Sequence, residues 1–287
     1  MIRIGTRGSA LALWQAERVR SLLADRGVPS DLVIIRSTGD AQHDRPVAEL
    51  GAGAFTRELE EALLDRRIDA AVHSCKDLPS AVAPGLSLAA IPEREDPRDA
   101  AAGRRLSDLP PGSRVATSSP RRQEWIRRTF PGLLPVAVRG NVDTRLRKLD
   151  AGEFDALLLA MAGLKRLGLA GRVVEAWDVG TLVPPAGQGA IAVETRAGEE
   201  SRAAAIDDPI LHAAVRAERL LFQLLRAGCR TPIGAHAIVR PEGSVDLTVD
   251  LAGIRASGSG PNAETAAMSA ALELRGAGAE AIIARWR

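Results

Sequence analysis

Short apolar segments alternate with helical patterns along most of this 287-residue chain, and this alternation limits the possible folds more than any other feature. A stretch with two prolines and five charges at 92–98 interrupts the alternation, which then restarts. Alternating strands and helices favour parallel sheets with helices on both faces. The predicted strands are 2–4, 31–36, 69–73, 87–91, 114–116, 134–138, 154–159 and 191–194.

Helix start and stop signals separate these strands. Ser9 is a natural N-cap for a first helix that ends before Gly27, and Pro120 suits the first position of another. The other helices are predicted near 55–63, 142–151 and 164–167.

The last part of the chain has a different pattern. One strongly amphipathic helix is predicted over 209–225, followed by strands at 235–239 and 244–250 and a helical C-terminus. The paired prolines at 184–185 mark a second crossing between domains. We therefore predict two α/β domains and a smaller α+β domain.

The composition excludes several classes of protein. The chain has 38 basic and 36 acidic residues, eight Phe or Trp residues and no Tyr, which argues against a general nucleic-acid binder. Two cysteines exclude a disulfide scaffold, and no apolar run is long enough to span a membrane. Arg3 and Arg7 stand where a signal peptide needs its apolar core, so we expect a cytoplasmic protein.

Five strand-to-helix turns carry hydroxyl groups or cations. Helix N-termini bind anions, so such turns along one sheet edge predict a shared cleft for a ligand with several carboxylates or phosphates. The alternative for each turn is a capped helix with a solvated arginine. The turns are 6–9, 73–77, 117–122, 139–141 and 165–166.

Asp77 and Cys229 differ from their surroundings. Asp77 is a carboxylate among cations and is expected to stay ionised, either to stabilise a developing positive charge or simply to pair with Lys76 or cap a helix. Cys229 lies in a Gly-Cys-Arg-Thr-Pro turn and is either an exposed nucleophile or a buried, inert thiol. Cys75, beside Lys76, is a second candidate for an activated thiol.

Other chemistries lack their motifs. The sequence contains no phosphate-binding P-loop, no dinucleotide-binding GxGxxG and no GxSxG nucleophile elbow. The four histidines are scattered without metal-ligand spacing, so we expect no metal site.

Seven segments, read in order, resemble the porphobilinogen deaminase family, also called hydroxymethylbilane synthases. They cover nearly the whole chain, and their combination is highly specific. The segments are GTRGSALALWQA (5–16), AVHSCKDLPS (71–80), IPEREDPRDA (91–100), VATSSPRRQ (115–123), VRGNVDTRLRKLDAGEFDALLLAMAGLKRLGL (138–169), PAGQGAIAVE (185–194) and AGCRTPIGAHA (227–237).

The resemblance implies a fold. It predicts two sheet domains like those of solute-binding proteins (periplasmic-binding-protein type II) and a small C-terminal α+β domain. The implied limits are 1–92 with 190–207 for the first domain, 97–184 for the second and 209–287 for the third.

The resemblance also implies an activity. The family's transferases condense four porphobilinogen molecules head to tail, release ammonia and give hydroxymethylbilane for porphyrin and haem biosynthesis. They build on a dipyrromethane cofactor held by a thioether, which here falls on Cys229, while Cys75 stands where the family often has methionine. Asp77 matches the catalytic aspartate. We expect a monomer whose small-molecule partner is porphobilinogen, with no nucleic-acid or membrane partner.

The remaining site residues come from the same resemblance. The expected cofactor-binding residues are Lys76, Asp77, Ser119, Arg121, Arg122 and Arg145, and Asp40 matches another cofactor-side position. The expected substrate-binding residues are Arg7, Ser9, Gln15, Thr117, Ser118, Arg139, Arg145, Arg166 and Gln188.

Two departures from the family pattern concern charge. Ala52 replaces a cation in the 51–55 loop, for which we therefore expect no ligand contact, and Asp143 adds a carboxylate near Arg139 and Arg145.

Two other classes of protein fit less well. A non-catalytic polyanion binder would have the same cationic turns, but it would not explain Cys229 in its loop or Asp77 among cations. A transcription regulator would need a helix-turn-helix segment, which we do not find at the N-terminus.

Overall fold

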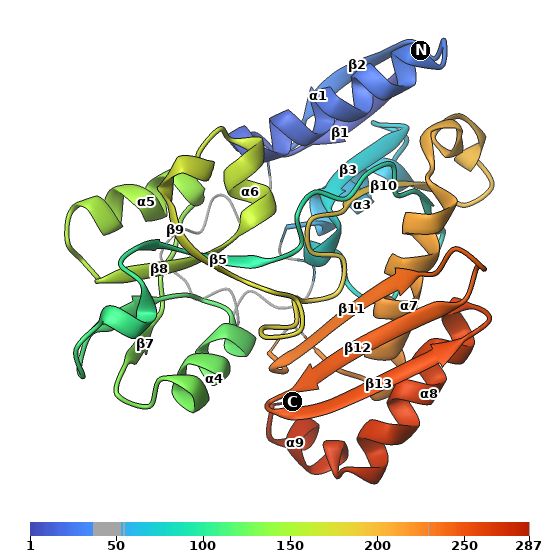
Figure 1. Cartoon of the computed structure of the whole chain (residues 1–287). Helices are drawn as coiled ribbons and strands as arrows, with labels where there is room; N and C mark the ends of the chain where they lie inside the picture. The colour runs from blue at the N-terminus through green and yellow to red at the C-terminus, as the bar shows by residue number, and fades with distance from the viewer. Residues whose placement is uncertain (37–52, 54, 229, 287) are drawn as a thin grey trace.

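The computed structural model describes residues 1–36, 53, 55–228 and 230–286, and this part of the chain forms three β-sheets with packed helices (Figure 1). The strands are β1 (Ile2–Thr6), β2 (Ser30–Ile34), β3 (Ala70–Ser74), β4 (Leu86–Ala90), β5 (Asp99–Gly103), β6 (Arg114–Ala116), β7 (Leu134–Val136), β8 (Ala156–Ala160), β9 (Val173–Trp177), β10 (Ile191–Arg196), β11 (Ile233–Val239), β12 (Val245–Leu251) and β13 (Ile254–Gly260). The helices are α1 (Ala10–Asp25), α3 (Arg57–Leu64), α4 (Pro120–Thr129), α5 (Val142–Asp150), α6 (Met161–Arg166), α7 (Pro209–Leu225), α8 (Ala263–Gly276) and α9 (Ala279–Arg285), with a short 3₁₀ helix, η2 (Cys75–Asp77).

The first two sheets share one topology. The first has the order β2–β1–β3–β10–β4, and the second has the order β7–β6–β8–β5–β9. In each, the first three strands are parallel, and the fourth runs antiparallel to both of its neighbours. The predicted fold class, two α/β sheet domains and a small α+β domain, is confirmed.

Each antiparallel strand follows a crossing between the two sheets. Strand β5 enters the second sheet directly after 92–98, and β10 enters the first sheet directly after 184–190. The two halves of the protein are therefore joined by two chain segments. On this sheet membership we base the proposed domain limits, 1–92 with 190–207, 97–184 and 209–287.

The third sheet is an antiparallel meander of β11, β12 and β13 covered by α7 and α8. The buried face of α8 consists largely of alanines, which let the helix lie close to the sheet. A Cβ atom on Gly258 of β13 would lie only 2.1 Å from the Ala266 carbonyl oxygen. The close approach therefore depends on small residues on both sides.

Three strands were not predicted from the sequence. Strand β5 reads Asp-Ala-Ala-Ala-Gly, and β13 has only Ile254 among small and polar residues, so both have few of the large or branched side chains typical of strands. In β5 and β13 tertiary pairing overrides weak local preference. Strand β9, Val173–Trp177, lies at the edge of the second sheet and contains valines and a tryptophan that favour a strand.

Both crossings are fixed to helix α7 by one buried carboxylate. Glu218 accepts hydrogen bonds from Arg94 Nη1 at 2.7 Å and from the Gly187 backbone N–H at 2.7 Å. It also accepts one from the Ala237 backbone N–H at 2.8 Å, and His236 Nδ1 lies 3.5 Å away. Burial by itself would raise the pKa of Glu218, but Arg94 and His236 hold that pKa at about 2.

Replacing Glu218 with glutamine should destabilise the protein strongly. The change leaves the buried Arg94 guanidinium without its counter-charge, and such a loss costs about 3–5 kcal/mol. Urea unfolding of both proteins at neutral pH measures this difference. Because the pKa of Glu218 is lowered in the folded protein, its contribution is complete above the unfolded value near 4.5 and declines as the pH falls toward 2.

Glu264→Gln provides the matched control, since this glutamate pairs with Arg216 at the exposed end of the same domain. Surface pairs of this kind contribute at most about 1 kcal/mol. Equal unfolding free energies for the two variants would contradict the role assigned to Glu218.

Candidate active site

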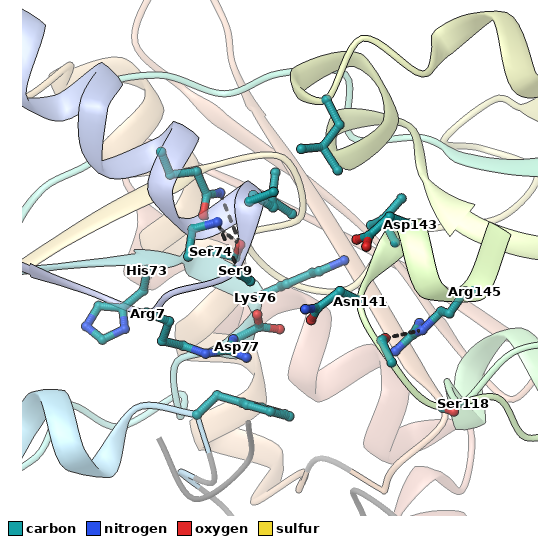
Figure 2. Close-up of a pocket in the computed structure, with 18 of the residues that line it drawn as sticks. Arg7, Ser9, His73, Ser74, Lys76, Asp77, Ser118, Asn141, Asp143 and Arg145 are labelled. Atoms are coloured by element: carbon teal, nitrogen blue, oxygen red, sulfur yellow. Dashed lines mark hydrogen bonds between the residues drawn. The ribbon is translucent and has the colours of Figure 1, made fainter. Parts of the chain in front are cut away.

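A cleft of about 350 Å³ lies between the first and second sheets (Figure 2). One wall is formed by the turn after β1, the start of α1 and the end of β3. The other wall is formed by the segment before α4 and the start of α5. Figure 2 shows Lys76 and Asp77 on one side, with Asn141 and Arg145 on the other.

The turns do not follow one sheet edge, and that expectation was wrong. Turns 6–9 and 73–77 belong to the first sheet, whereas 117–122 and 139–141 belong to the second. The parallel strands of both sheets point their carboxyl ends at the same cleft, so four of the five turns contribute to its lining. Residues 165–166 are not a strand-to-helix turn, because they are the last two residues of α6. Arg166 lines only a smaller cavity of about 100 Å³, which shares part of the cleft's lining.

Cations outnumber carboxylates among the described residues of the cleft. Burial, with Arg122 and Arg139 nearby, lowers the pKa of Arg145 to about 10, and its Nε donates to the Gly140 carbonyl at 2.7 Å. The Arg7 guanidinium lies 4.4 Å from the centre of the Phe55 ring. The cationic lining residues are Arg7, Lys76, Arg122, Arg139 and Arg145, and the acidic ones are Asp77 and Asp143.

Lys76 and Asp77 are adjacent in η2, immediately after β3. Both side chains face the cleft. The surrounding protein lowers the pKa of Lys76 to about 8 by desolvation, with a smaller opposing effect from Asp77. Lys76 therefore changes charge much closer to neutral pH than a lysine in water does.

The two arginines at the start of α4 have different surroundings. Arg122 lines the cleft, whereas Arg121 lines neither cavity. Arg121 donates to the Val183 carbonyl at 2.9 Å, and both guanidinium groups contact the buried carboxylate of Asp99.

The hydroxyl groups of the turns serve mainly to hold backbone. Ser9 Oγ caps α1 by accepting from the Ala12 N–H, and Ser119 Oγ caps α4 by accepting from the Arg122 N–H. Both line the cleft, as does Ser118. Thr117 is buried and lines neither cavity.

Gln15 and Arg166 lie at the smaller cavity. Gln15 lines both cavities and is bonded to Ser74 Oγ on β3, 3.0 Å from its Nε2. Arg166 donates to the Gly189 carbonyl at 2.9 Å and stacks at 5.3 Å on the ring of Trp14. Trp14 is 37% exposed, and its ring supports Arg166.

Gln188 is fully buried and lines neither cavity. Its amide contacts Lys76 Nζ, Asp99 Oδ1 and the Pro97 carbonyl. Gln188 therefore reaches the cleft only through its neighbours.

Of the two cysteines, Cys75 lies within the described part of the chain. Cys75 is buried against Gly187, and burial raises the pKa of its thiol to about 11, as expected for an inert thiol. Cys229, Asp40 and Ala52 lie outside the described residues.

The predicted turns include Asn141, which lines the cleft, and Ser74, which supports Gln15. Phe55 also lines the cleft, although no ligand contact was expected for the 51–55 loop. Asp99 lies in the DPRDA segment, but its role depends on its contact with α4. No motif or spacing along the sequence indicates that contact.

Comparison with known proteins gives the family. A family model described as "Porphobilinogen deaminase, dipyromethane cofactor binding domain" matches residues 2–204. The porphobilinogen deaminase of Thiobacillus denitrificans is 44% identical over 303 residues, covering 98% of this chain and 97% of that protein. The one from Mycolicibacterium paratuberculosis is 50% identical over 245 residues, covering 83% and 78%.

Solved structures of solute-binding proteins also match. The methionine-binding protein MetQ matches with a TM-score of 0.47 and 15% identity, over 72% of this chain and 90% of that one. A periplasmic substrate-binding protein from Coxiella burnetii matches with a TM-score of 0.45 and 14% identity, over 73% and 93%.

No helix in the described ranges is both long enough and apolar enough to cross a membrane. The family model spans both sheet domains, and the relatives extend over the third. The chain belongs to the porphobilinogen deaminase family.

Proposed function

We propose that this chain is a hydroxymethylbilane synthase, a transferase that condenses four porphobilinogen molecules head to tail with release of ammonia. The observation that carries the proposal is the convergence of cations from two sheets on one cleft that also contains Asp77. Each porphobilinogen unit carries an acetate and a propionate group, so a growing chain of such units needs several cations. Arginine binds carboxylates through two parallel N–H groups, which suits this ligand.

The described donors fit a dipyrromethane cofactor, since that group also presents carboxylates. Lys76, Ser119, Arg122 and Arg145 would hold it at the cleft, and Cys229 would supply the thioether. When bound, the cofactor provides the pyrrole onto which the first substrate is added. Arg121, already engaged by Asp99, would act mainly by supporting Arg122.

The substrate-binding residues would be those nearer β1 and α5. Arg7, Ser9, Ser118 and Arg139 line the cleft, while Gln15 and Arg166 line the smaller cavity beside it. Thr117 and Gln188 would contribute through the backbone and side chains that they position.

Asp77 would stabilise the positive charge that forms on the substrate. When ammonia leaves porphobilinogen, the carbon–nitrogen bond breaks and the pyrrole becomes a cationic azafulvene. A new carbon–carbon bond then forms, and a proton is lost. A fixed carboxylate at this position lowers the energy of the cation without reorganising at the moment of reaction.

The cytoplasmic location and the monomeric state stay predictions. Neither is needed for the chemistry of the cleft.

The intact mass of the purified protein tests the cofactor and its attachment. We expect wild type to carry the added mass of a dipyrromethane and Cys229→Ser to lack it. If wild type is unmodified, weighing it again after addition of porphobilinogen distinguishes an unloaded enzyme from a protein that only binds polyanions. An unmodified protein after that addition would contradict the proposal.

Asp77→Asn keeps the shape of the side chain and removes its charge. We expect turnover of porphobilinogen to fall by about 100-fold or more, as when an electrostatic group is removed from other active sites, with little change in the unfolding midpoint. Asp143→Asn removes the other carboxylate among the described lining residues and should retain most of the turnover. Near-normal turnover in Asp77→Asn would contradict the role of Asp77.

The lowered pKa of Lys76 predicts the pH dependence of anion binding. Lys76 is charged below about pH 8 and neutral above it, so citrate should bind less tightly as the pH rises through that value. Isothermal titration of Cys229→Ser, which lacks the cofactor, with and without Lys76→Met, between about pH 7 and about pH 9 measures this, because arginines keep their charge over the range. An identical pH dependence in the two proteins would show that another group is responsible.

A further inference from the structure

Asp99 lies at the start of β5 with no exposed surface and is surrounded by cations. Its Oδ2 accepts from Arg121 Nη2 at 2.5 Å. Its Oδ1 accepts from Arg122 Nη2 at 2.6 Å and from Arg122 Nε at 3.0 Å. One carboxylate thus holds two consecutive arginines of α4.

Carbonyl groups fix the other edges of the same two guanidinium groups. Arg121 Nη1 donates to the Val183 carbonyl at 2.9 Å, and Arg122 Nη1 donates to the Leu158 carbonyl at 3.0 Å. With three donors engaged, the plane of Arg122 is determined by the protein before any ligand binds. Such preorganisation avoids part of the entropy cost of binding.

Gln188 connects this cluster to the opposite wall of the cleft. Its Nε2 donates to Asp99 Oδ1 at 2.9 Å and to the Pro97 carbonyl at 2.7 Å. Both acceptors require the amide nitrogen on that side, so the amide oxygen faces Lys76, whose Nζ lies 3.2 Å away. The bonds Lys76–Gln188–Asp99–Arg122 therefore run unbroken from the first sheet to the second.

This connection passes through both crossings between the sheets. Pro97 belongs to the first crossing and Gln188 to the second, while Asp99 begins the strand that follows the first. The relative position of Lys76 and Arg122 thus depends on bonds made at the crossings.

We propose that Asp99 is a positioning residue of the carboxylate-binding cleft: it orients Arg122 directly and, through Gln188, keeps Lys76 aligned with Arg122 across the two sheets. The proposal rests on the proposed function, in which the cleft binds carboxylates. Asp99 itself lines neither cavity and touches no ligand site.

Two opposing effects make this proposal testable with Asp99→Asn. If Asp99 acted only through its charge, its removal would leave the cleft more positive and citrate would bind more tightly. If Asp99 acts by positioning, Arg122 loses its fixed orientation and citrate binds less tightly. We expect the second result, with a loss of about tenfold at neutral pH, comparable to the loss of one charged hydrogen bond.

The protonation of Lys76 provides a second readout. Asp77 and Asp99 favour its charged form, whereas Arg121 and Arg122 disfavour it. Loss of the Asp99 charge should therefore move the pH at which citrate binding weakens below its value with Asp99 intact. Gln188→Leu removes the hydrogen bond to Lys76 but keeps the contacts between Asp99 and the arginines, so it should move that pH in the same direction with a smaller loss of affinity.

The experiment uses the full chain with Cys229→Ser, which lacks the cofactor and leaves Lys76 and Arg122 open to citrate. Citrate is titrated at several pH values into this parent protein and into the same protein with Asp99→Asn, Gln188→Leu or Asp108→Asn. Asp108 is exposed at the end of a short 3₁₀ helix (Leu106–Asp108) before β6, so its variant controls for loss of one carboxylate from the same domain. In steady-state assays with porphobilinogen, the KM of Asp99→Asn should rise by a larger factor than its kcat falls. Unfolding midpoints identify any variant that is not folded.

The outcomes separate the two proposals. A wild type that does not turn over porphobilinogen, together with a Cys229→Ser protein that does not bind citrate, would overturn the proposed function. An active wild type with unchanged or tighter citrate binding when Asp99→Asn is added to Cys229→Ser would overturn the positioning role. If Asp99→Asn does not fold, Gln188→Leu decides, and an unmoved pH dependence in that variant would overturn the proposal.

Discussion

Repulsion between like charges is the constraint on which the rest of the cleft depends. Five Arg or Lys side chains among its described lining residues face one another from two sheets, and a cluster of this kind raises the energy of the empty protein. Burial is the main cause of the lowered pKa values of Lys76 and Arg145, and the neighbouring arginines add to that lowering. Asp99 offsets part of the repulsion from below the surface, so the cleft can remain open and cationic until a ligand with several carboxylates supplies the missing negative charge.

The third domain contacts both crossings between the sheets. Glu218 of α7 binds Arg94 in one crossing and the Gly187 N–H in the other, and Arg219 of the same helix donates to the Pro79 carbonyl just beyond Asp77. A small domain outside the cleft thereby fixes the two segments that join the sheets. Because these contacts are buried and charged, they favour discrete arrangements of the sheets over gradual bending.

The sequence was most informative where local signals and tertiary structure agree. Ser9 and Pro120 fixed helix starts, the break at 92–98 fixed the division into halves, and the motif segments identified the family. It was less informative where a residue's role depends on distant partners. Nothing adjacent to Asp99 in the chain indicates that it holds Arg121 and Arg122, and both arginines had been assigned to the ligand.

Arg121 and Arg122 are equally buried, and their roles differ because only Arg122 borders the cleft. An arginine whose donors already contact a carboxylate and a carbonyl, as in Arg121, gains little from a further anion, whereas one that also borders the cleft, as in Arg122, can present its remaining N–H groups there. The two neighbouring arginines therefore have different roles. Arg121 ties the helix to Val183 and Asp99, and Arg122 faces the cleft with an orientation set by Asp99 and the Leu158 carbonyl. Gln188 positions Lys76 in a similar way, because its amide bonds both Lys76 and Asp99. The alignment of the two walls of the cleft therefore depends on buried hydrogen bonds as well as on the side chains that line it.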